Sequence, residues 1–249
     1  MRYLAAIVLA PALLAASPGK EQELPIGRVL WGQYRATGFM VDRCTLVTTR
    51  HIAAPHRVRI GKAFRFDLFG LQRGAKVVAF GQGRDMRVPG SLRASDWLVA
   101  RLDRCLDGDR RYFHLLAGPV ADSELLFGRF GLYSAAGFPG GRRKPAKSTP
   151  CRLRAVGVEG TIETDCRIVA GYSGGPLFVR LGDGKLLAIG IISAGDRKIP
   201  AMLAAPVAQL AAPGITFAES PGAALTPINS RNPTSPAAAR AASISTAGR

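Results

Sequence analysis

The sequence predicts an all-β protein built from two strand-rich halves. Three observations support this class: apolar runs are short and rich in β-formers, Gly 29 and Pro 17 provide many turns, and no long run has helical periodicity. The chain has 249 residues, of which 47% are hydrophobic and 20% charged. This composition allows a substantial core and differs from that of disordered or coiled-coil proteins.

The N-terminus carries a pattern typical of export. Arg2 precedes an apolar run over residues 4–16, which is too short to span a bilayer. We therefore expect a signal peptide over residues 1–19 and a mature protein that is secreted or periplasmic. No later segment is long and apolar enough to form a transmembrane span.

The first half of the mature chain contains short apolar segments broken by glycine and charge. These segments cover residues 28–34, 36–41, 44–49, 56–60, 64–69, 75–80 and 97–102. Each has the length and composition of a strand. They predict a first β unit over about residues 26–112.

A charged, irregular stretch over 103–125 is predicted to connect this unit to a second one, over about 126–212. The second unit has strand-like segments at 129–138, 151–164, 175–180 and 185–194, and "APVAQLAA" (205–212) is predicted to form a short C-terminal helix. Two such halves are typical of two small β-barrels or of a sandwich. Residues 217–249 are rich in Ala, Pro and Ser and predict a disordered tail.

The four cysteines predict two disulfides, because an even number in an exported protein favours pairing. Three pairings are possible. We favour Cys44 with Cys105 and Cys151 with Cys166, which places one bond in each half. No two cysteines form a C-x-x-C pair, so a zinc site has little support, and no metal or organic cofactor is expected.

The formal net charge of +17 would attract anionic partners such as anionic lipid, lipopolysaccharide, nucleic acid or acidic protein. It is equally compatible with general solubility. The segment "GGRRKPAKSTPCRLR" (140–154) has six cations and no acid, which suits a solvated loop or an anionic surface. The basic runs lack interleaved aromatic residues, so no specific nucleic-acid partner is expected.

The segment "VAGYSGGPLF" (169–178) contains the candidate nucleophile, Ser173. A serine hydroxyl needs a base and donors for the developing oxyanion. The chain has three histidines, and His51 follows an apolar strand in "CTLVTTRHIAAP". Asp96 precedes another apolar strand, where a partly buried carboxylate could orient the imidazole. A lone G-x-S-G-G sequence is a turn in most proteins, so the conjunction carries the prediction.

These segments resemble the catalytic blocks of the trypsin-like (chymotrypsin-fold) serine proteases of bacterial type. "VTTRH" ends at His51, "DWLVARL" begins at Asp96, and "GYSGGP" spans 171–176. The order and the 45-residue spacing from His51 to Asp96 match the family. Three further segments are similar to family strands: "ATGFMV" (36–41), "SAAGFPGG" (134–141) and "GIISAG" (190–195).

The resemblance implies two six-stranded antiparallel β-barrels within a protease domain over residues 20–216. It also implies hydrolysis of peptide bonds in protein or peptide substrates through an acyl-enzyme. Ser173 would be the nucleophile, His51 the base, and Asp96 the group that orients His51. The backbone N–H groups of Gly171 and Ser173 would form the oxyanion hole. The alternative is a catalytically weak or inactive protease-fold binding module for anionic partners.

The resemblance also assigns a substrate pocket, and one residue nearby departs from the family pattern. Ser193, Ala194 and Gly195 would form one wall, and Arg167 would occupy the pocket-floor position six residues before Ser173. A cation there would favour Asp or Glu at the cleaved position. Tyr172 replaces the aspartate that in digestive members pairs with a new N-terminal amine, so activation without that ion pair is expected.

Overall fold

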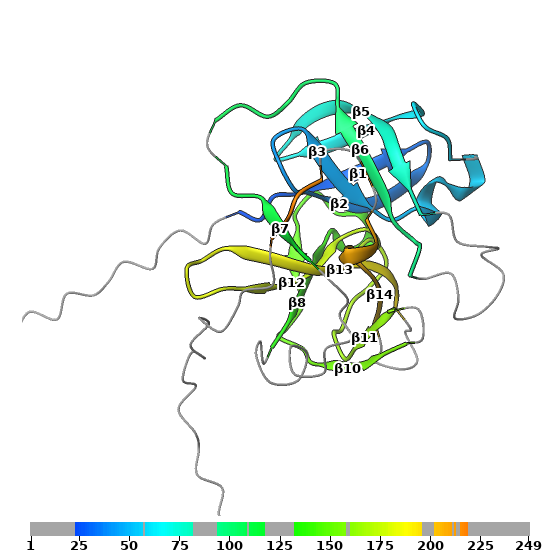
Figure 1. Ribbon diagram of the computed structural model, residues 1–249. Coiled ribbons are helices and arrows are strands. Elements are labelled where there is room, and N and C mark those ends of the chain that lie inside the picture. Colours follow the sequence, from blue (N-terminus) through cyan, green and yellow to red (C-terminus); the bar gives the residue numbers. More distant parts are fainter. Residues whose placement is uncertain are drawn as a thin grey trace, which may run out of the picture.

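The computed structural model describes residues 23–56, 58–81, 94–108, 110–117, 132–157, 160–195, 202–210, 212 and 215–218. These residues form two β-sheet units, which lie one above the other in Figure 1. The predicted signal peptide (1–19) and residues 219–249 of the predicted tail lie outside the described residues. Helical residues in the described part are limited to short 3-10 segments, η1 (His51–His56), η3 (Pro139–Gly141) and η4 (Val207–Gln209).

The first unit is a closed barrel of six antiparallel strands in the order β1-β2-β3-β6-β5-β4. The strands are β1 (Ile26–Trp31), β2 (Tyr34–Met40), β3 (Thr45–Thr48), β4 (Ala63–Leu68), β5 (Leu71–Phe80) and β6 (Leu98–Leu102). Their inward side chains form an apolar core that includes Val29, Met40, Leu46 and Phe66, all fully buried. This barrel is the first unit that the sequence predicts, closed as the family resemblance implies.

The second unit is a nine-stranded sheet in which β10-β11-β14-β13-β12-β8-β9 follow one another, with β7 beside β13 and β15 beside β7. The strands are β7 (Phe113–Leu116), β8 (Ser134–Gly137), β9 (Ala146–Lys147), β10 (Leu153–Val156), β11 (Ile162–Thr164), β12 (Pro176–Arg180), β13 (Leu186–Gly195), β14 (Met202–Pro206) and β15 (Phe217–Ala218). Strand pairing among the described residues does not close this sheet into the expected second barrel. The segments before β8 and β10 meet through one bridge, between Tyr133 and Cys151.

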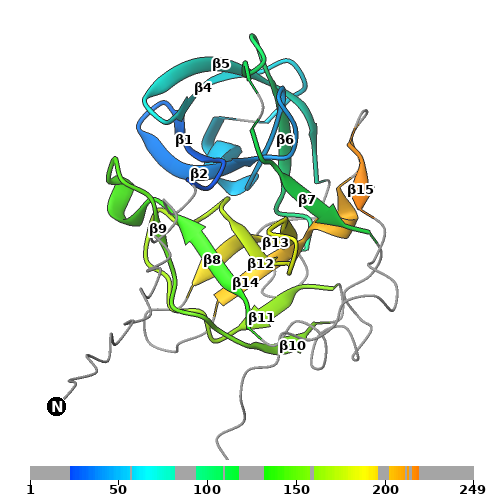
Figure 2. The ribbon, with the colours of Figure 1, turned by 90° about the vertical axis from the view of Figure 1, so that its left-hand side faces the viewer.

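Two expectations about single elements are corrected by the second sheet. The predicted connection over 103–125 contains β7, which pairs in parallel with β13, and Figure 2 shows β7 and β15 side by side. Because only four residues form β7, its alternation of buried Phe113, exposed His114 and buried Leu115 is masked by the charged residues around it. The segment predicted as a C-terminal helix (205–212) instead begins with the last two residues of strand β14, which ends at Pro206. It continues as the single 3-10 turn η4.

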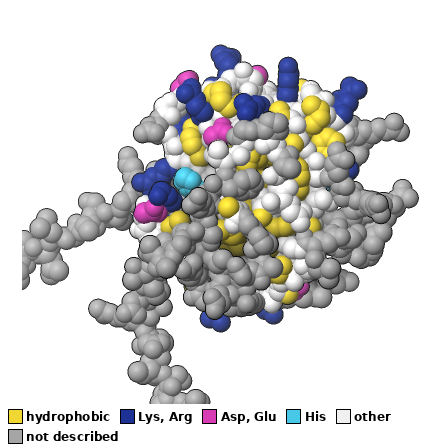
Figure 3. Space-filling view, viewed as in Figure 1, with side chains coloured by type: hydrophobic (Ala, Val, Ile, Leu, Met, Phe, Trp, Pro, Cys, Tyr) yellow, Lys and Arg dark blue, Asp and Glu magenta, His cyan; other side chains and the backbone are white. Residues whose placement is uncertain are grey.

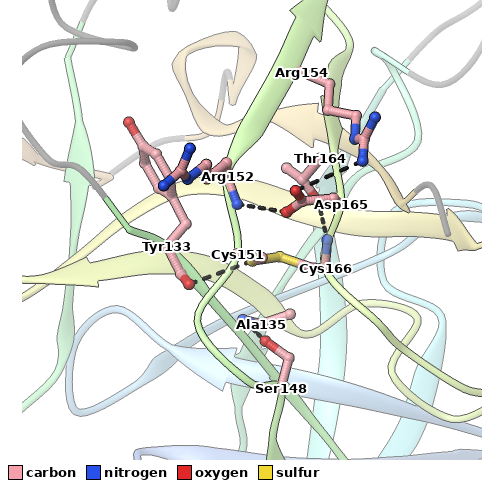
Figure 4. The surroundings of a disulfide bond; sticks show 9 residues. All are labelled: Tyr133, Ala135, Ser148, Cys151, Arg152, Arg154, Thr164, Asp165 and Cys166. Carbon is pink, nitrogen blue, oxygen red and sulfur yellow. Dashed lines mark hydrogen bonds and ion pairs between the residues drawn. A yellow bond between two sulfur atoms is a disulfide. The ribbon is translucent and has the colours of Figure 1, made fainter. Parts of the chain in front are cut away.

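The cysteines pair as favoured from the sequence, with Cys44 joined to Cys105 and Cys151 to Cys166. Figure 4 shows the second bond, whose two Cα atoms lie 4.8 Å apart. Beside it, the Arg152 N–H donates to the Asp165 carboxylate at 2.6 Å, and the Cys166 N–H donates to the Thr164 hydroxyl at 3.2 Å. The disulfide therefore anchors the start of the segment that leads to Ser173.

On the face that Figure 3 draws, positive and negative side chains lie close together. In Figure 3, Lys and Arg side chains stand over the first barrel with Asp and Glu side chains between them. The six cations of the 140–154 segment are all exposed, and Arg154 lies 3.7 Å from the Asp165 carboxylate. Within the described residues, no helix has the length and apolar character needed to cross a membrane.

Candidate active site

His51 and Asp96 meet because strands β3 and β6 are neighbours in the barrel. Thr48 at the end of β3 pairs with Leu98 at the start of β6, so the residues after β3 lie beside those before β6. His51 is the third residue after Thr48, and Asp96 lies two residues before Leu98. Two residues that are 45 positions apart in the chain are thereby brought into contact.

Asp96 holds His51 by two hydrogen bonds. One carboxylate oxygen, Oδ1, accepts the His51 backbone N–H at 2.8 Å, and Oδ2 lies 2.7 Å from Nδ1 of the ring. Because an ionised carboxylate only accepts hydrogen bonds, Nδ1 carries the proton. The His51 side chain is 31% exposed, and Nε2 is the ring nitrogen that Asp96 does not contact.

The Asp96 carboxylate is stabilised in its charged form although only 3% of the residue is exposed. Burial raises its pKa, but hydrogen bonds from His51, Ser193 and Thr49 and the charge interaction with His51 together bring the pKa below the ordinary value of 3.8. The Ser193 hydroxyl donates to Oδ2 from strand β13, so the second sheet also contributes to this cluster.

Ser173 lies on a tight turn, residues 170–175, that we call the nucleophile turn. The turn is fastened to β13 by two hydrogen bonds, from the Gly174 N–H to the Ile192 carbonyl at 2.7 Å and from the Ile192 N–H to the Gly175 carbonyl at 2.9 Å. It is fastened to β2 by the Thr37 N–H, which donates to the Ser173 carbonyl at 2.8 Å. Ser173 itself is partly exposed.

Gly174 brings the nucleophile turn against the segment that carries His51. Its φ of 82° is in the left-handed region, and a Cβ there would lie 2.2 Å from the Thr37 carbonyl oxygen and 2.9 Å from the Thr49 nitrogen. Thr49 is two residues before His51. Among the described residues, no hydrogen bond joins the Ser173 hydroxyl to the His51 ring, a contact that is often long without substrate.

The nucleophile turn also leaves two backbone donors available. In the described part of the chain, the N–H groups of Gly171 and Ser173 donate to no backbone carbonyl. Gly171 has a φ of 99°, and a Cβ there would lie 2.1 Å from the Phe138 carbonyl oxygen, so only glycine fits. Two such N–H groups on either side of one residue can stabilise an oxyanion on a neighbouring carbonyl carbon.

Tyr172 occupies the interior beside this turn. Its side chain is 5% exposed and packs in the core of the second unit, and burial raises the pKa of its phenol. Gly137 accommodates it, since a Cβ on Gly137 would lie 2.7 Å from the Tyr172 Cα atom. The turn is therefore anchored here by apolar packing.

The residues predicted to bind substrate differ in how deeply they are buried. Ser193 directs its buried hydroxyl to Asp96, while Ala194 is half-buried and Gly195 is exposed at the end of β13. Arg167 is exposed, and Ile168 is the residue that lies against Gly195, with its Cγ1 2.8 Å from the position of a Cβ there.

Two residues of the site, and the hydrogen-bonding role of a third, were not identified from the sequence. Thr37, Thr49 and the hydroxyl of Ser193 all contribute hydrogen bonds around His51, Asp96 or the nucleophile turn. A hydroxyl inside an otherwise apolar strand, as in "GIISAG", is the only signal that could have pointed to Ser193. The described residues contain no cluster of metal-binding side chains.

Comparisons with solved structures identify the fold. The chain is similar to the Rv3671c protease in its inactive form, with 16% identity, a TM-score of 0.51, and coverage of 74% of this chain and 84% of that one. A serine-to-alanine mutant of Rv3671c from M. tuberculosis H37Rv, also in an inactive form, has 14% identity and a TM-score of 0.50, with coverage of 73% of this chain and 80% of that one. A Glu endopeptidase in complex with MPD has 13% identity and a TM-score of 0.55, with coverage of 74% of this chain and 85% of that one.

These similarities show that the chain has the trypsin/chymotrypsin fold of serine proteases, as the sequence resemblance predicted. At identities of 13% to 16% they define the fold alone. No family model matches the sequence, and no curated protein sequence matches it.

Proposed function

We propose that the protein is a serine endopeptidase that uses Ser173, His51 and Asp96. Ser173 Oγ attacks the scissile carbonyl, and its proton passes to Nε2 of His51. Asp96 keeps Nδ1 protonated and stabilises the imidazolium. The oxyanion accepts hydrogen bonds from the Gly171 and Ser173 N–H groups. The imidazolium then protonates the leaving amine. In the second half of the reaction, His51 accepts a proton from the water that attacks the acyl-enzyme and returns it to Ser173 Oγ.

The observation that carries this proposal is the pair of bonds from Asp96 to His51. A carboxylate that accepts both the backbone N–H and the Nδ1 proton of one histidine leaves the ring a single orientation. A buried carboxylate whose pKa is lowered by its neighbours is typical of functional sites. The glycine-bounded turn on which Ser173 lies adds the nucleophile and the oxyanion donors.

Covalent labelling tests the proposal. The folded protein should react with a fluorophosphonate probe at Ser173, and Ser173→Ala and heat-denatured protein should not. His51→Ala, which keeps the serine, should slow labelling by about a thousandfold or more. A folded protein that stays unlabelled, or a label on another residue, would refute the peptidase proposal and favour a binding module.

We also propose that Arg167 favours an acidic residue at the cleaved position. Arg167 lies next to disulfide-bonded Cys166 at the start of the segment that leads to Ser173, and its exposed guanidinium is available to a substrate carboxylate. One solved structure of similar fold is a Glu endopeptidase. A peptide-library profile should show cleavage after Asp or Glu that Arg167→Ala reduces. Cleavage after Lys or Arg would rule this preference out.

Export is proposed from the N-terminal pattern together with the two disulfides. Expression with residues 1–19 in a host that has an oxidising compartment should deliver a shortened, oxidised protein outside the cytoplasm. N-terminal sequencing and thiol titration would measure both features. A protein retained in the cytoplasm at full length would contradict this proposal.

A further inference from the structure

Thr37 connects the first barrel to the nucleophile turn at two points. It lies in strand β2 and is fully buried. Its N–H donates to the Ser173 carbonyl at 2.8 Å, and its hydroxyl donates to the Gly171 carbonyl at 2.6 Å. One residue therefore holds both residues whose N–H groups would bind the oxyanion.

The Thr37 hydroxyl has a fully determined hydrogen-bond geometry. It accepts the Phe138 N–H at 3.1 Å while it donates to Gly171, which uses its single proton. The Thr37 carbonyl accepts the Thr48 hydroxyl at 2.7 Å, so its own backbone is fixed from β3. Such a satisfied, buried network specifies one arrangement of its members.

The two peptide planes on either side of the Gly171 Cα atom are each fixed by one hydrogen bond. In the plane that contains the Gly171 N–H, the Ala170 carbonyl accepts the Gly140 N–H at 2.7 Å. In the next plane, the Gly171 carbonyl accepts the Thr37 hydroxyl. Because glycine has little conformational preference of its own, these two bonds determine the direction of its N–H.

The anchors described for this turn are all uncharged. Tyr172 contributes apolar packing against Gly137 where an acidic residue could have formed an ion pair. The Thr37 hydroxyl and the Gly140 N–H contribute neutral hydrogen bonds. All of them come from residues within the folded chain, so none requires a newly formed N-terminus.

We propose that Thr37 is a positioning residue whose hydroxyl sets the oxyanion-binding orientation of the Gly171 and Ser173 N–H groups as the chain folds. This inference rests on the proposed peptidase function. It assigns to a residue of β2 a role in transition-state stabilisation that packing alone would not give it.

The test compares variants of Thr37 with and without the hydroxyl. Thr37→Val has the shape of threonine without its hydroxyl, and Thr37→Ser keeps the hydroxyl. Thr37→Val should lower kcat and the fluorophosphonate labelling rate by about tenfold to a hundredfold, with KM changed less than about twofold. Thr37→Ser should retain most of the activity. If Thr37→Val does not fold, Thr37→Ala against Thr37→Ser gives the same comparison.

Thr45→Val is the matched control. Thr45 is a threonine of β3 that is 2% exposed, and its hydroxyl has no hydrogen-bond partner among the described residues. It should leave kcat, KM and labelling at wild-type values. Equal rates in Thr37→Val and wild type, or a loss that only follows the folded fraction, would overturn the role of Thr37.

A readout independent of catalysis separates this inference from the proposed function. The backbone amide resonance of Gly171 should shift in Thr37→Val and remain in place in Thr45→Val. If wild-type protein fails to label, the peptidase proposal falls, while this resonance still decides whether Thr37 orients the turn. An unshifted Gly171 amide would overturn the inference whatever the activity.

Discussion

Asp96 shows how single residues determine the candidate site. Its carboxylate is buried, which opposes ionisation, yet its surroundings supply hydrogen bonds to both oxygens. The net effect is a pKa below the ordinary value of 3.8. The site therefore retains a fixed negative charge beside His51 throughout the neutral range.

Asp96→Asn tests the consequence for chemistry. An amide can donate to Nδ1, which would place the imidazole proton on Nε2 and remove the base. We expect kcat to fall by about 10⁴-fold while the circular dichroism spectrum is unchanged. Asp183→Asn, at an exposed hairpin position, is the control and should have wild-type activity. An active Asp96→Asn enzyme would show that His51 is not the base.

The same pKa shift predicts how stability depends on pH. Because the folded-state pKa of Asp96 is below its unfolded value near 3.8, ionised Asp96 stabilises the fold above that pH, and the contribution is lost as pH falls through the folded-state pKa. The difference in Tm between wild type and Asp96→Asn should therefore shrink below about pH 4. Calorimetry from pH 7 to pH 2 measures it, and a difference that grows in acid would contradict the assignment.

The sequence was sufficient to select the candidate residues that lie in local motifs. His51, Asp96 and Ser173 each have a recognisable segment around them, and their order along the chain is informative. Thr37 was missed, and Ser193 was predicted only as part of a pocket wall, because their partners are 134 and 97 residues away and nothing near them in sequence signals the contact. Their roles depend on how two sheets pack, which local patterns do not encode.

At the scale of elements, the disulfide between Cys151 and Cys166 fixes the start of the chain segment that leads to the nucleophile turn. It closes a segment of 15 residues that contains β10 and β11. Cross-linking a loop of this length should contribute about 3 kcal/mol by restricting the unfolded chain. Cys166 is followed within seven residues by Ser173, so the bond also limits the motion of the segment between them.

Replacing both cysteines with serine should lower the free energy of unfolding by about 3 kcal/mol and reduce kcat/KM. Urea unfolding and peptide hydrolysis below the new transition would measure the two effects. The matched variant without Cys44 and Cys105, which span 61 residues, should lose at least as much stability. A double-serine variant with wild-type stability would show that the bond is dispensable for folding.

Strands were predictable where an apolar run was long enough to stand out from its neighbours. Each strand of the first barrel includes or overlaps such a run, whereas the run predicted as a strand at 56–60 forms no strand among its described residues. The 205–212 segment was misjudged because alanine favours helix, whereas Ala205 pairs with Ile191 and Pro206 with Gly190 in the sheet. Pairing with strands that are distant in the chain therefore outweighed local propensity.

For the whole molecule, the uncharged anchors of the nucleophile turn predict activity that does not depend on a particular N-terminus. Proteins that begin at residues 18, 20 and 22, or with an added Gly-Ser extension, should have kcat/KM values within about twofold of one another, because neutral hydrogen bonds and packing hold the turn. Peptide hydrolysis by each purified form measures this. Activity restricted to one N-terminus would indicate an activating ion pair that the described contacts do not include.

Strand β7 also changes where the molecule can be divided. The chain leaves the first barrel, adds β7 to the second sheet in parallel with β13, and returns after β14 to place β15 on the outer side of β7. A fragment that begins at residue 126 and ends at 212 would lack both of these strands and would uncover an edge of β13. An autonomous second half would have to start before Phe113 and extend past Ala218, although it would still lack Thr37, which lies in the first barrel.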